Sequence, residues 1–314
     1  MENNNVERSM EMRFGDAIIK SPEGGIRYGV FELLEDKKIT HGFSAISKNM
    51  SFGAEKSGLE RRALNVRLGQ FLREIGIPTE KQVIMTANLF KPIGNFVIIG
   101  EKGLTLNQLP LLREIYGDDL VRSASDYPRF VGSEYAADGI FTNEPGIALE
   151  AVSRDCMPII VAVRSAQKSL TGIVHGGRRQ IEAGLGERIV AFCREFADAS
   201  PEEILIGIGP HIRSCHYFFN RRQIAEDEGG KSVSINEERW GDYLINKSKD
   251  VFSLDMEGLL TQELISKGVL PQCVARADLC SYDAQEQSFS AASLRYQSKH
   301  NLPPSRMITV ALHD

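Results

Sequence analysis

A cysteine and a histidine stand at the two ends of a pair of apolar runs near the middle of the chain. Cys156 precedes the run MPIIVAV and His175 follows the run SLTGIV, with the polar stretch SAQKS between the runs. Apolar, β-branched runs of this length are typical of buried strands, and a short polar stretch between them favours a turn. We therefore expect two neighbouring strands that bring Cys156 and His175 to the same end of one sheet.

A thiolate and an imidazole at one place support two kinds of chemistry. Together they can bind a transition metal ion, or they can act as a nucleophile and its general base. A structural interpretation also stands, in which Cys156 is an ordinary buried side chain and His175 a hydrogen-bonded turn residue, since free cysteine is among the most buried residue types. The spacing alone leaves all three open.

The residues after His175 predict an anion site. The segment RRQIEAGLGERIVAFCREF has apolar residues at helical spacing, which predicts one amphipathic helix beginning directly after HGG. A helix N-terminus presents free N–H groups and a positive dipole end, both of which favour bound phosphate. Arg178 and Arg179 would add donors at the end of the helix where positive charge does not stabilise it. The alternative is that these arginines are surface charge.

Three further histidines bear on metal binding. His41 begins the sequence HGFS, and a single histidine beside a glycine is usually structural. His211, Cys215 and His216 form the pattern HxxxCH, which fits no strong template for a metal site.

Composition excludes several classes of protein. The chain of 314 residues is 42% hydrophobic and 25% charged, as in ordinary soluble globular proteins. Its net charge of −5 gives no basic surplus for nucleic acid or an anionic membrane. The N-terminus has no signal-peptide pattern, and no apolar run reaches the roughly 20 residues of a membrane helix. Five cysteines without a CxxC spacing favour reduced thiols over a disulfide scaffold. We expect a cytoplasmic protein that binds small molecules; its oligomeric state stays open.

Helix and strand signals are interleaved. Residues 1–11 are expected to be a flexible tail, and residues 12–314 a single domain in which 12–33 form two strands around the turn SPEGG. The clearest helices span 57–76, with a capping box at its start, and 255–268, with Asp255 as N-cap and Gly268 after its end. Residues 220–250 are expected to be a polar surface excursion.

The missing motifs narrow the fold class. The chain has no GxGxxG, GxxxxGK[ST], HExxH or GxSxG, which argues against Rossmann, P-loop, zincin and α/β-hydrolase folds. We expect an α/β protein with mixed α+β layers, its sheets flanked by helices.

Six segments in order resemble one family. They are HGFSAISKNMS, DGIFTNEPGIALEAVSRDCMPIIV, IVHGGRRQIEAGL, IGPHIRSCHYF, LDMEGLLTQELISKGV and the closing SFSAASLRYQ…PSRMITVAL. They are similar to HGFSTRxGGVS, DALVTNxPGxALxVxTADCxPxxx, AHAGWRGxxxG, xGPxIGPCCYEV, LDLxxxxxxQLxxxGV and FFSYRR…TGRQxxVIxL of the laccase-domain family. Its members are also called multicopper polyphenol oxidase-like, purine nucleoside phosphorylase-type or peptidoglycan-editing-factor proteins. The resemblance runs from about residue 27 to residue 312.

The resemblance implies a fold, a metal site and an activity. The fold is a single laccase-like domain with central mixed sheets flanked by helices. The metal is a zinc or copper ion held by a cysteine and two histidines, and Cys156 and His175 match the cysteine and one histidine. The activity is phosphorolysis of purine nucleosides, with adenosine deamination and phenol oxidation also attributed to the family. Cys156 and His175 are thereby assigned to catalysis and metal binding, and Arg178, Arg179 and Ser44 to substrate and phosphate binding.

The chain departs from the family at positions that carry chemistry. The family's first histidine ligand, in a QVHG segment, falls within VIMTANLFKPIG, which has no histidine. A third ligand would then have to come from His41 or His216. The tryptophan of HAGWRG is Arg178 here, and the glutamate of PCCYE is Phe218. The residues typical of the family's fold are retained, while residues that carry its chemistry have changed. This pattern indicates a divergent or inactive member of the family.

Three functions remain. The first is a metal-dependent, divergent purine nucleoside phosphorylase-like enzyme that converts nucleoside and phosphate into base and ribose 1-phosphate. The second is a metal-free hydrolase or transferase in which Cys156 attacks, His175 is the base, and Arg154 and Arg179 lower the thiol pKa. The third is a catalytically impaired or non-catalytic binding protein on the same fold. True multicopper oxidase chemistry ranks last, because it needs many histidine ligands and the chain has six histidines.

Overall fold

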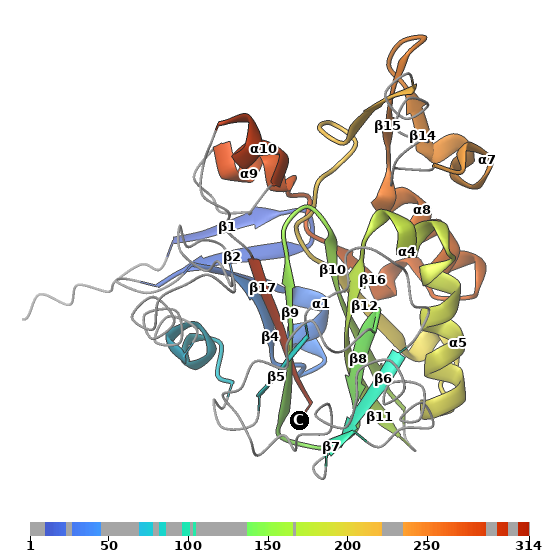
Figure 1. Ribbon diagram of the computed structural model, residues 1–314. Coiled ribbons are helices and arrows are strands. Elements are labelled where there is room, and N and C mark those ends of the chain that lie inside the picture. Colours follow the sequence, from blue (N-terminus) through green and yellow to red (C-terminus); the bar gives the residue numbers. More distant parts are fainter. Residues whose placement is uncertain are drawn as a thin grey trace, which may run out of the picture.

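Two seven-stranded β-sheets form the body of the protein, and they pack against each other (Figure 1). The first sheet has the order β1-β2-β3-β4-β17-β9-β5 and the second the order β16-β12-β10-β11-β8-β6-β7. A three-stranded sheet, β13-β15-β14, stands beside them. The computed structural model describes residues 10–22, 27–44, 69–77, 82–85, 96–100, 103–104, 137–165, 168–221, 235–286, 294–300 and 307–313.

The first sheet is antiparallel except where β5 runs parallel to β9. Its beginning differs from expectation, because residues 10–31 form three strands instead of two and the first strand starts inside the expected tail. A turn at Gly15, whose φ is +58°, separates the first two. The helix α1 (Glu32–Asp36) follows the third strand. The strands are β1 (Met10–Phe14), β2 (Ala17–Ser21), β3 (Tyr28–Phe31), β4 (His41–Ser44), β5 (Gln82–Met85), β9 (Ile147–Ser153) and β17 (Met307–His313).

The second sheet contains the predicted pair of strands. Strand β10 (Met157–Arg164) lies antiparallel to β11 (Ser169–Gly176) along its whole length, which confirms the pairing expected from the two apolar runs. Residues 157–163 are all buried, because one face of the sheet meets the first sheet and helices cover the other. The remaining strands are β6 (Phe96–Gly100), β7 (Gly103–Leu104), β8 (Gly139–Thr142), β12 (Ile204–Ile208) and β16 (Val274–Arg276).

Two hydrophobic clusters stabilise these layers. The larger cluster includes Leu149 and Ala151 of β9 together with β10, β11 and the helices beyond them. The smaller cluster includes Ala148 and Val152, which alternate with the first two along β9 and therefore face the other side of the first sheet. Residues 71–77, the described end of the predicted helix 57–76, pack there.

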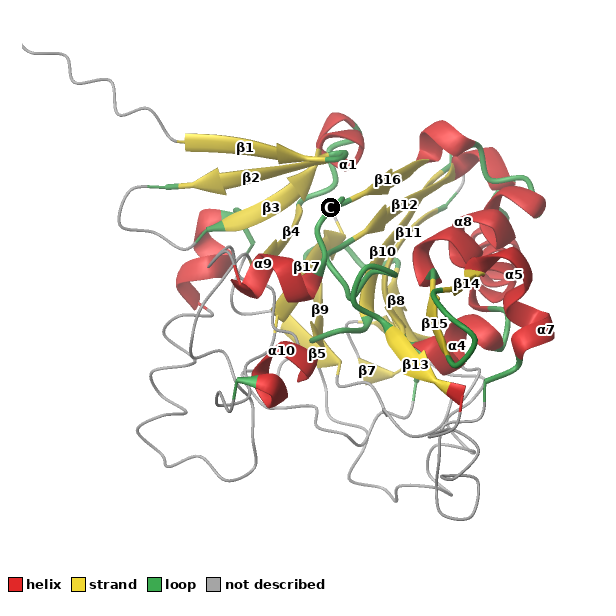
Figure 2. Cartoon of the chain, turned by 90° about the horizontal axis from the view of Figure 1, so that it is seen from above, coloured by secondary structure: helices red, strands yellow, loops and turns green. Residues whose placement is uncertain are grey.

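Helices cover the outer face of the second sheet (Figure 2). The segment after HGG forms two helices instead of one, α4 (Arg178–Glu182) and α5 (Leu185–Ala197). Gly184 separates them with a φ of +77°, a conformation that favours glycine and interrupts a helix. Helix α8 (Met256–Ser266) has its predicted caps, since the Asp255 side chain accepts a hydrogen bond from the Gly258 N–H and Gly268 has a φ of +96°.

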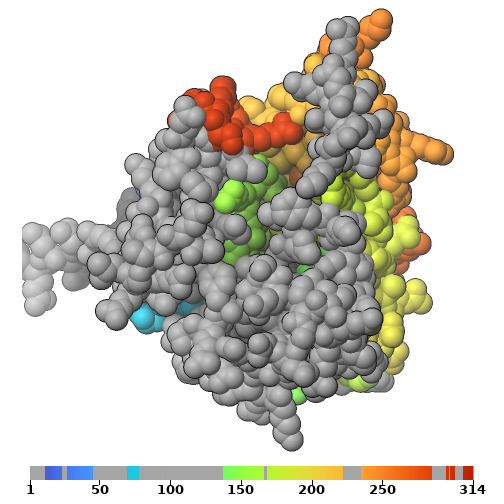
Figure 3. All heavy atoms as spheres, viewed as in Figure 1, coloured from blue at the N-terminus to red at the C-terminus, as the bar shows by residue number. Residues whose placement is uncertain are grey.

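The described part of the predicted surface excursion, residues 220–221 and 235–250, contains strands and a helix, and its outer part projects from the body (orange in Figure 3). Trp240, within it, is fully buried. Among the described residues no helix is long and apolar enough to cross a membrane. The helical candidates at 106–125 lie outside the described residues. The remaining elements are β13 (Phe218–Asn220), α7 (Glu237–Trp240), β14 (Leu244–Asn246), β15 (Val251–Leu254), α9 (Ser281–Glu286), α10 (Leu294–Lys299) and three 3₁₀ turns, Pro201–Glu203, Gly241–Tyr243 and Pro271–Cys273.

Candidate functional site

Cys156 lies against the HGG turn, residues 175–177, at one end of the second sheet. In the register of β10 and β11, Pro158 is opposite His175 and Met157 is opposite Gly176. A Cβ atom placed on Gly177 would lie 3.6 Å from the Cys156 Sγ and 2.5 Å from the Gln180 Oε1. The thiol therefore lies beside the backbone of Gly177, directly before the start of α4. The hairpin therefore brings the thiol and the His175 segment to one place.

Asp138 anchors the other side of the HGG turn. Its backbone oxygen accepts a hydrogen bond of 2.8 Å from the N–H of His175, whose side chain is only 3% exposed. Its carboxylate accepts hydrogen bonds from Gln180 Nε2 at 3.3 Å and from Arg188 Nη1 at 2.8 Å. Asp138 thus holds β8, β11 and the two helices α4 and α5 in a constant arrangement around His175.

Tyr217 and Arg295 belong to the same region, and sequence reasoning missed both. Burial raises the pKa of Tyr217 above its ordinary value, Cys156 raises it further, and Arg178 and Arg295 oppose the shift, so all three groups act on the phenol. The Arg295 guanidinium carbon lies 4.9 Å from the centroid of the Tyr217 ring. Both residues stand in segments that carry the family resemblance, IGPHIRSCHYF and SFSAASLRYQ, where only cysteine and histidine had drawn attention.

Asp155 connects these segments. Its carboxylate accepts a hydrogen bond of 2.9 Å from Ser281 Oγ and one of 3.3 Å from the backbone N–H of Arg295. Its backbone oxygen accepts one of 2.9 Å from the N–H of Ile212. The turn that carries Cys156 is therefore joined to the loop before β13 and to α9 and α10.

Burial keeps the Cys156 thiol protonated. Burial raises its pKa to about 12, and the neighbouring charge of Asp155 contributes in the same direction. The metal-free Cys–His hypothesis needs the charges of Arg154 and Arg179 to lower the pKa of the thiol, because the thiolate is the nucleophile. The shift in the structure has the opposite direction. The structure therefore does not support Cys156 as a nucleophile activated by these arginines. A bound metal ion would change this balance, since a coordinating thiol loses its proton.

Two of the residues expected at a phosphate site have structural partners. Arg178 is 8% exposed, and its Nη1 donates a hydrogen bond of 2.8 Å to the Glu182 carboxylate. Ser44 is buried within the first sheet, where its Oγ accepts a hydrogen bond of 3.0 Å from the N–H of Ile308. This corrects the expectation for Ser44, which faces a neighbouring strand. Arg179 is partly exposed and stays a candidate. The helix expected behind it has only the five residues of α4.

His41 is a structural residue, and we withdraw it as a possible third metal ligand. Its Nε2 accepts a hydrogen bond of 2.7 Å from the N–H of Phe31, and its Nδ1 donates one of 2.7 Å to the backbone oxygen of Ile39. Burial lowers its pKa to about 4, which keeps the ring neutral and its Nε2 able to accept a hydrogen bond. Both ring nitrogens are thus in use within the first sheet.

Replacing His41 with alanine is expected to lower the free energy of unfolding by about 2–3 kcal/mol, because two buried backbone groups lose their partner. Chemical denaturation measures this loss. Metal content per chain is expected to stay unchanged; a metal lost together with His41, in a variant that is still folded, would return it to the list of ligands.

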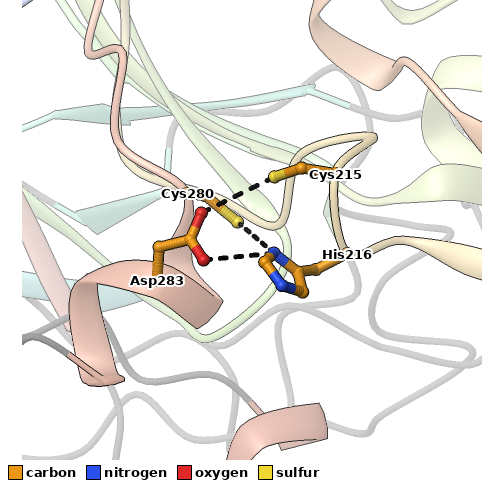
Figure 4. A group of neighbouring side chains, drawn as sticks. All are labelled: Cys215, His216, Cys280 and Asp283. Atoms are coloured by element: carbon orange, nitrogen blue, oxygen red, sulfur yellow. Dashed lines mark hydrogen bonds and ion pairs between the residues drawn. The ribbon is translucent and has the colours of Figure 1, made fainter.

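His216 lies in a different group of metal-binding side chains. Cys215, His216, Cys280 and Asp283 form what we call the thiol cluster, whose ligand atoms all lie within 4.8 Å of one another (Figure 4). Among the described residues it is the one such group of three or more. His211 is adjacent in sequence but stays out of it, since its Nδ1 donates to the backbone oxygen of Gly209.

Cys156 and His175 by themselves do not make a complete metal site. A catalytic zinc ion needs about three protein ligands and an open position. The described part of the chain supplies these two, and residues 86–95, where the family's first histidine would fall, lie outside it. We therefore derive no chemical step through a metal at this position.

A comparison with known families shows which family the chain belongs to. Residues 96–300, well over half of the chain, match the family described as multi-copper polyphenol oxidoreductase laccase. The chain belongs to this laccase family. The crystal structure of Bacillus licheniformis hypothetical protein YfiH has the same fold, with a TM-score of 0.67 and 18% identity over 91% of this chain and 96% of that chain. The resemblance noted in the sequence and the expected α/β fold are both confirmed.

Some laccase-family relatives carry the name of an enzyme. Purine nucleoside phosphorylase YlmD of Geobacillus stearothermophilus is 28% identical over 113 residues, which are 36% of this chain and 39% of that protein. Purine nucleoside phosphorylase YfiH of Escherichia coli is 25% identical over 182 residues, which are 57% of this chain and 66% of that protein. The chain thus spans less than two thirds of the length of these relatives.

Proposed function

We propose that the protein cleaves purine nucleosides with phosphate, giving the free base and ribose 1-phosphate, at the end of the second sheet. The observation that carries the proposal is the convergence there of Cys156, the HGG turn with His175, Tyr217 and Arg295. The names of the relatives supply the substrate class, and at 25 and 28% identity they support it at the level of the family.

The proposed roles follow from charge and position. Arg179 and Arg295 bind the phosphate, because guanidinium groups match its oxygens in charge and geometry. His175 holds a proton for the purine, which departs with the bonding electrons and leaves more readily when a proton or hydrogen bond neutralises it. Tyr217 has an aromatic ring that a purine can stack on and a hydroxyl that can donate a hydrogen bond. Arg178 contributes through its charge while it stays paired with Glu182.

Loss of the Cys156 or the His175 side chain is expected to lower turnover strongly. With inosine or adenosine and inorganic phosphate as substrates, Cys156→Ala and His175→Ala should each lower kcat/KM by about a hundredfold or more. Arg179→Ala should chiefly raise the KM for phosphate. Cys273→Ser, a thiol bonded to the backbone oxygen of Glu202 far along the sheet, is the matched control and should keep full activity.

The assay separates the alternatives. Free base that forms without phosphate would identify a hydrolase instead of a phosphorylase. Full activity in Cys156→Ala would show that the reaction does not use this site. A folded wild-type protein that binds nucleoside in calorimetry without turnover would favour the binding protein. The pairing of Arg178 with Glu182 and the incomplete ligand set of Cys156 and His175 are the observations on its side.

A further inference from the structure

We propose that the thiol cluster, Cys215, His216, Cys280 and Asp283, is a second and structural metal site that takes a zinc-type divalent cation. It goes beyond the proposed function and does not depend on it. Two thiolates, one imidazole and one carboxylate are the donor types that zinc prefers in proteins. The site is separate from Cys156 and His175, since the group within 4.8 Å contains neither of them.

The distances between the ligand atoms match a tetrahedron around zinc. Zinc bonds of the usual lengths place sulfur about 3.6 Å from nitrogen or oxygen, and nitrogen about 3.4 Å from oxygen. Cys280 Sγ lies 3.7 Å from His216 Nδ1, and Cys215 Sγ lies 3.7 Å from the Asp283 carboxylate. His216 Nδ1 lies 3.3 Å from the other oxygen of that carboxylate. In Figure 4 the four side chains point toward one another, Cys215 and His216 from the loop before β13, Cys280 from directly before α9 and Asp283 from α9 itself.

The surrounding structure holds these ligands in place. The His216 ring is stacked on Tyr282, with centroids 4.1 Å apart and an angle of 10° between the planes. The loop before β13 and the start of α9 are joined by the bridge between His211 and Cys280 and by the hydrogen bond of 2.8 Å from the Ser281 N–H to the His211 oxygen. The ligands are thus ordered before any ion binds, which lowers the entropy lost on binding.

An open path leads to the cluster. A cavity of about 320 Å³ is lined by Cys215, Cys280 and Asp283 together with Arg213, and Cys215 is exposed. An ion can therefore enter from solvent. Because four protein ligands fill a tetrahedral shell, the bound ion would have no open position for substrate, as in structural zinc sites.

The metal would stabilise the part of the candidate site that lies on the same loop. Tyr217 directly follows His216, and the backbone oxygen of His216 accepts a hydrogen bond of 3.4 Å from Arg295 Nη1. Ligation of Cys215 and His216 would therefore fix both the phenol beside Cys156 and the neighbouring guanidinium.

The experiment measures zinc uptake by untagged, reduced protein whose free thiols have been counted by mass spectrometry. Chelator-stripped protein is titrated with Zn²⁺ against a chromophoric competitor, and bound metal is counted by elemental mass spectrometry. We expect one equivalent at this site. Cys215→Ser/Cys280→Ser should lower its affinity at least a hundredfold, and Asp283→Asn by a smaller factor. Cys156→Ala, His175→Ala and the control Cys273→Ser should each retain it.

Cobalt gives a second readout that does not require the variants to have wild-type stability. Co²⁺ bound by two thiolates shows thiolate-to-metal charge-transfer bands, which are expected in wild type and in Cys156→Ala and absent in Cys215→Ser/Cys280→Ser. Failure of reduced wild type to take up zinc would overturn the proposal, as would a double variant with wild-type affinity. If the protein takes up zinc but does not catalyse phosphorolysis, the result supports the metal site and refutes only the proposed enzymatic function.

Discussion

Replacing Glu150 with glutamine is expected to stabilise the protein by about 5 kcal/mol above pH 8 and by little near pH 5. Glu150 is fully buried in the centre of β9, opposite Val310 of β17 and Ile84 of β5. Neither carboxylate oxygen has a hydrogen-bond partner among the described residues. Burial alone raises the pKa of this carboxyl group to about 8.

The direction of the pH dependence follows from the pKa of Glu150, which differs between the folded and the unfolded protein. In the unfolded chain Glu150 loses its proton near its ordinary pKa of 4.5, whereas the folded protein keeps the proton up to about pH 8. Between these values the folded state binds more protons, so its stability falls as pH rises, by about 1.4 kcal/mol per pH unit. Glutamine is neutral in both states and removes this dependence.

Urea denaturation of wild type and Glu150→Gln from pH 5 to pH 9 measures the effect. The two free energies of unfolding should diverge as pH rises. Glu187→Gln, an exposed change on α5, controls for the loss of one carboxylate, since its side chain is 48% exposed. Parallel curves for wild type and Glu150→Gln would show that Glu150 has a polar partner in the folded protein.

Replacing Glu182 with alanine is expected to lower the free energy of unfolding by about 3–5 kcal/mol, because two side chains and a backbone N–H lose their common acceptor in a largely buried place. The Glu182 carboxylate accepts hydrogen bonds from Arg178 Nη1 at 2.8 Å, from Trp240 Nε1 at 2.6 Å and from the Asn236 N–H at 3.1 Å. It thereby joins α4, directly after the HGG turn, to the segment that contains α7.

Trp240 is the single tryptophan of the chain, so the intrinsic fluorescence reports on this contact. Trp240 fluorescence should shift toward the emission of a solvated indole in Glu182→Ala. Arg178→Met/Glu182→Ala should recover part of the lost stability, because the buried guanidinium that lost its carboxylate acceptor is then removed as well. If the double variant is as unstable as the sum of the two single variants, the ion pair contributes nothing of its own.

The sequence alone determined the features that depend on neighbours along the chain. Cys156 and His175 meet because two apolar runs joined by a short polar connection pair with each other, and the length of a hairpin connection sets the register. Helix α8 begins at the Asp255 cap for an equally local reason, since a side chain of the cap residue bonds the first turn. The order of short motifs was sufficient to recognise the laccase family.

Only the tertiary structure decided which distant groups share a place. Cys215 and His216 meet Cys280 and Asp283, more than sixty residues further along, because a bridge between His211 and Cys280 joins their loops. No spacing rule links such segments, since their contact depends on how the whole chain crosses the sheets.

The role of single residues depended on the fold in the same way. His41 looked like a possible ligand until both of its ring nitrogens were found bonded to the backbone. Glu150 looked like any glutamate in an apolar run, and its raised pKa arises because strands on both sides remove water from the carboxylate. A side chain's type determines which chemistry it can do, but its burial and partners, which are set by non-local packing, determine which it does.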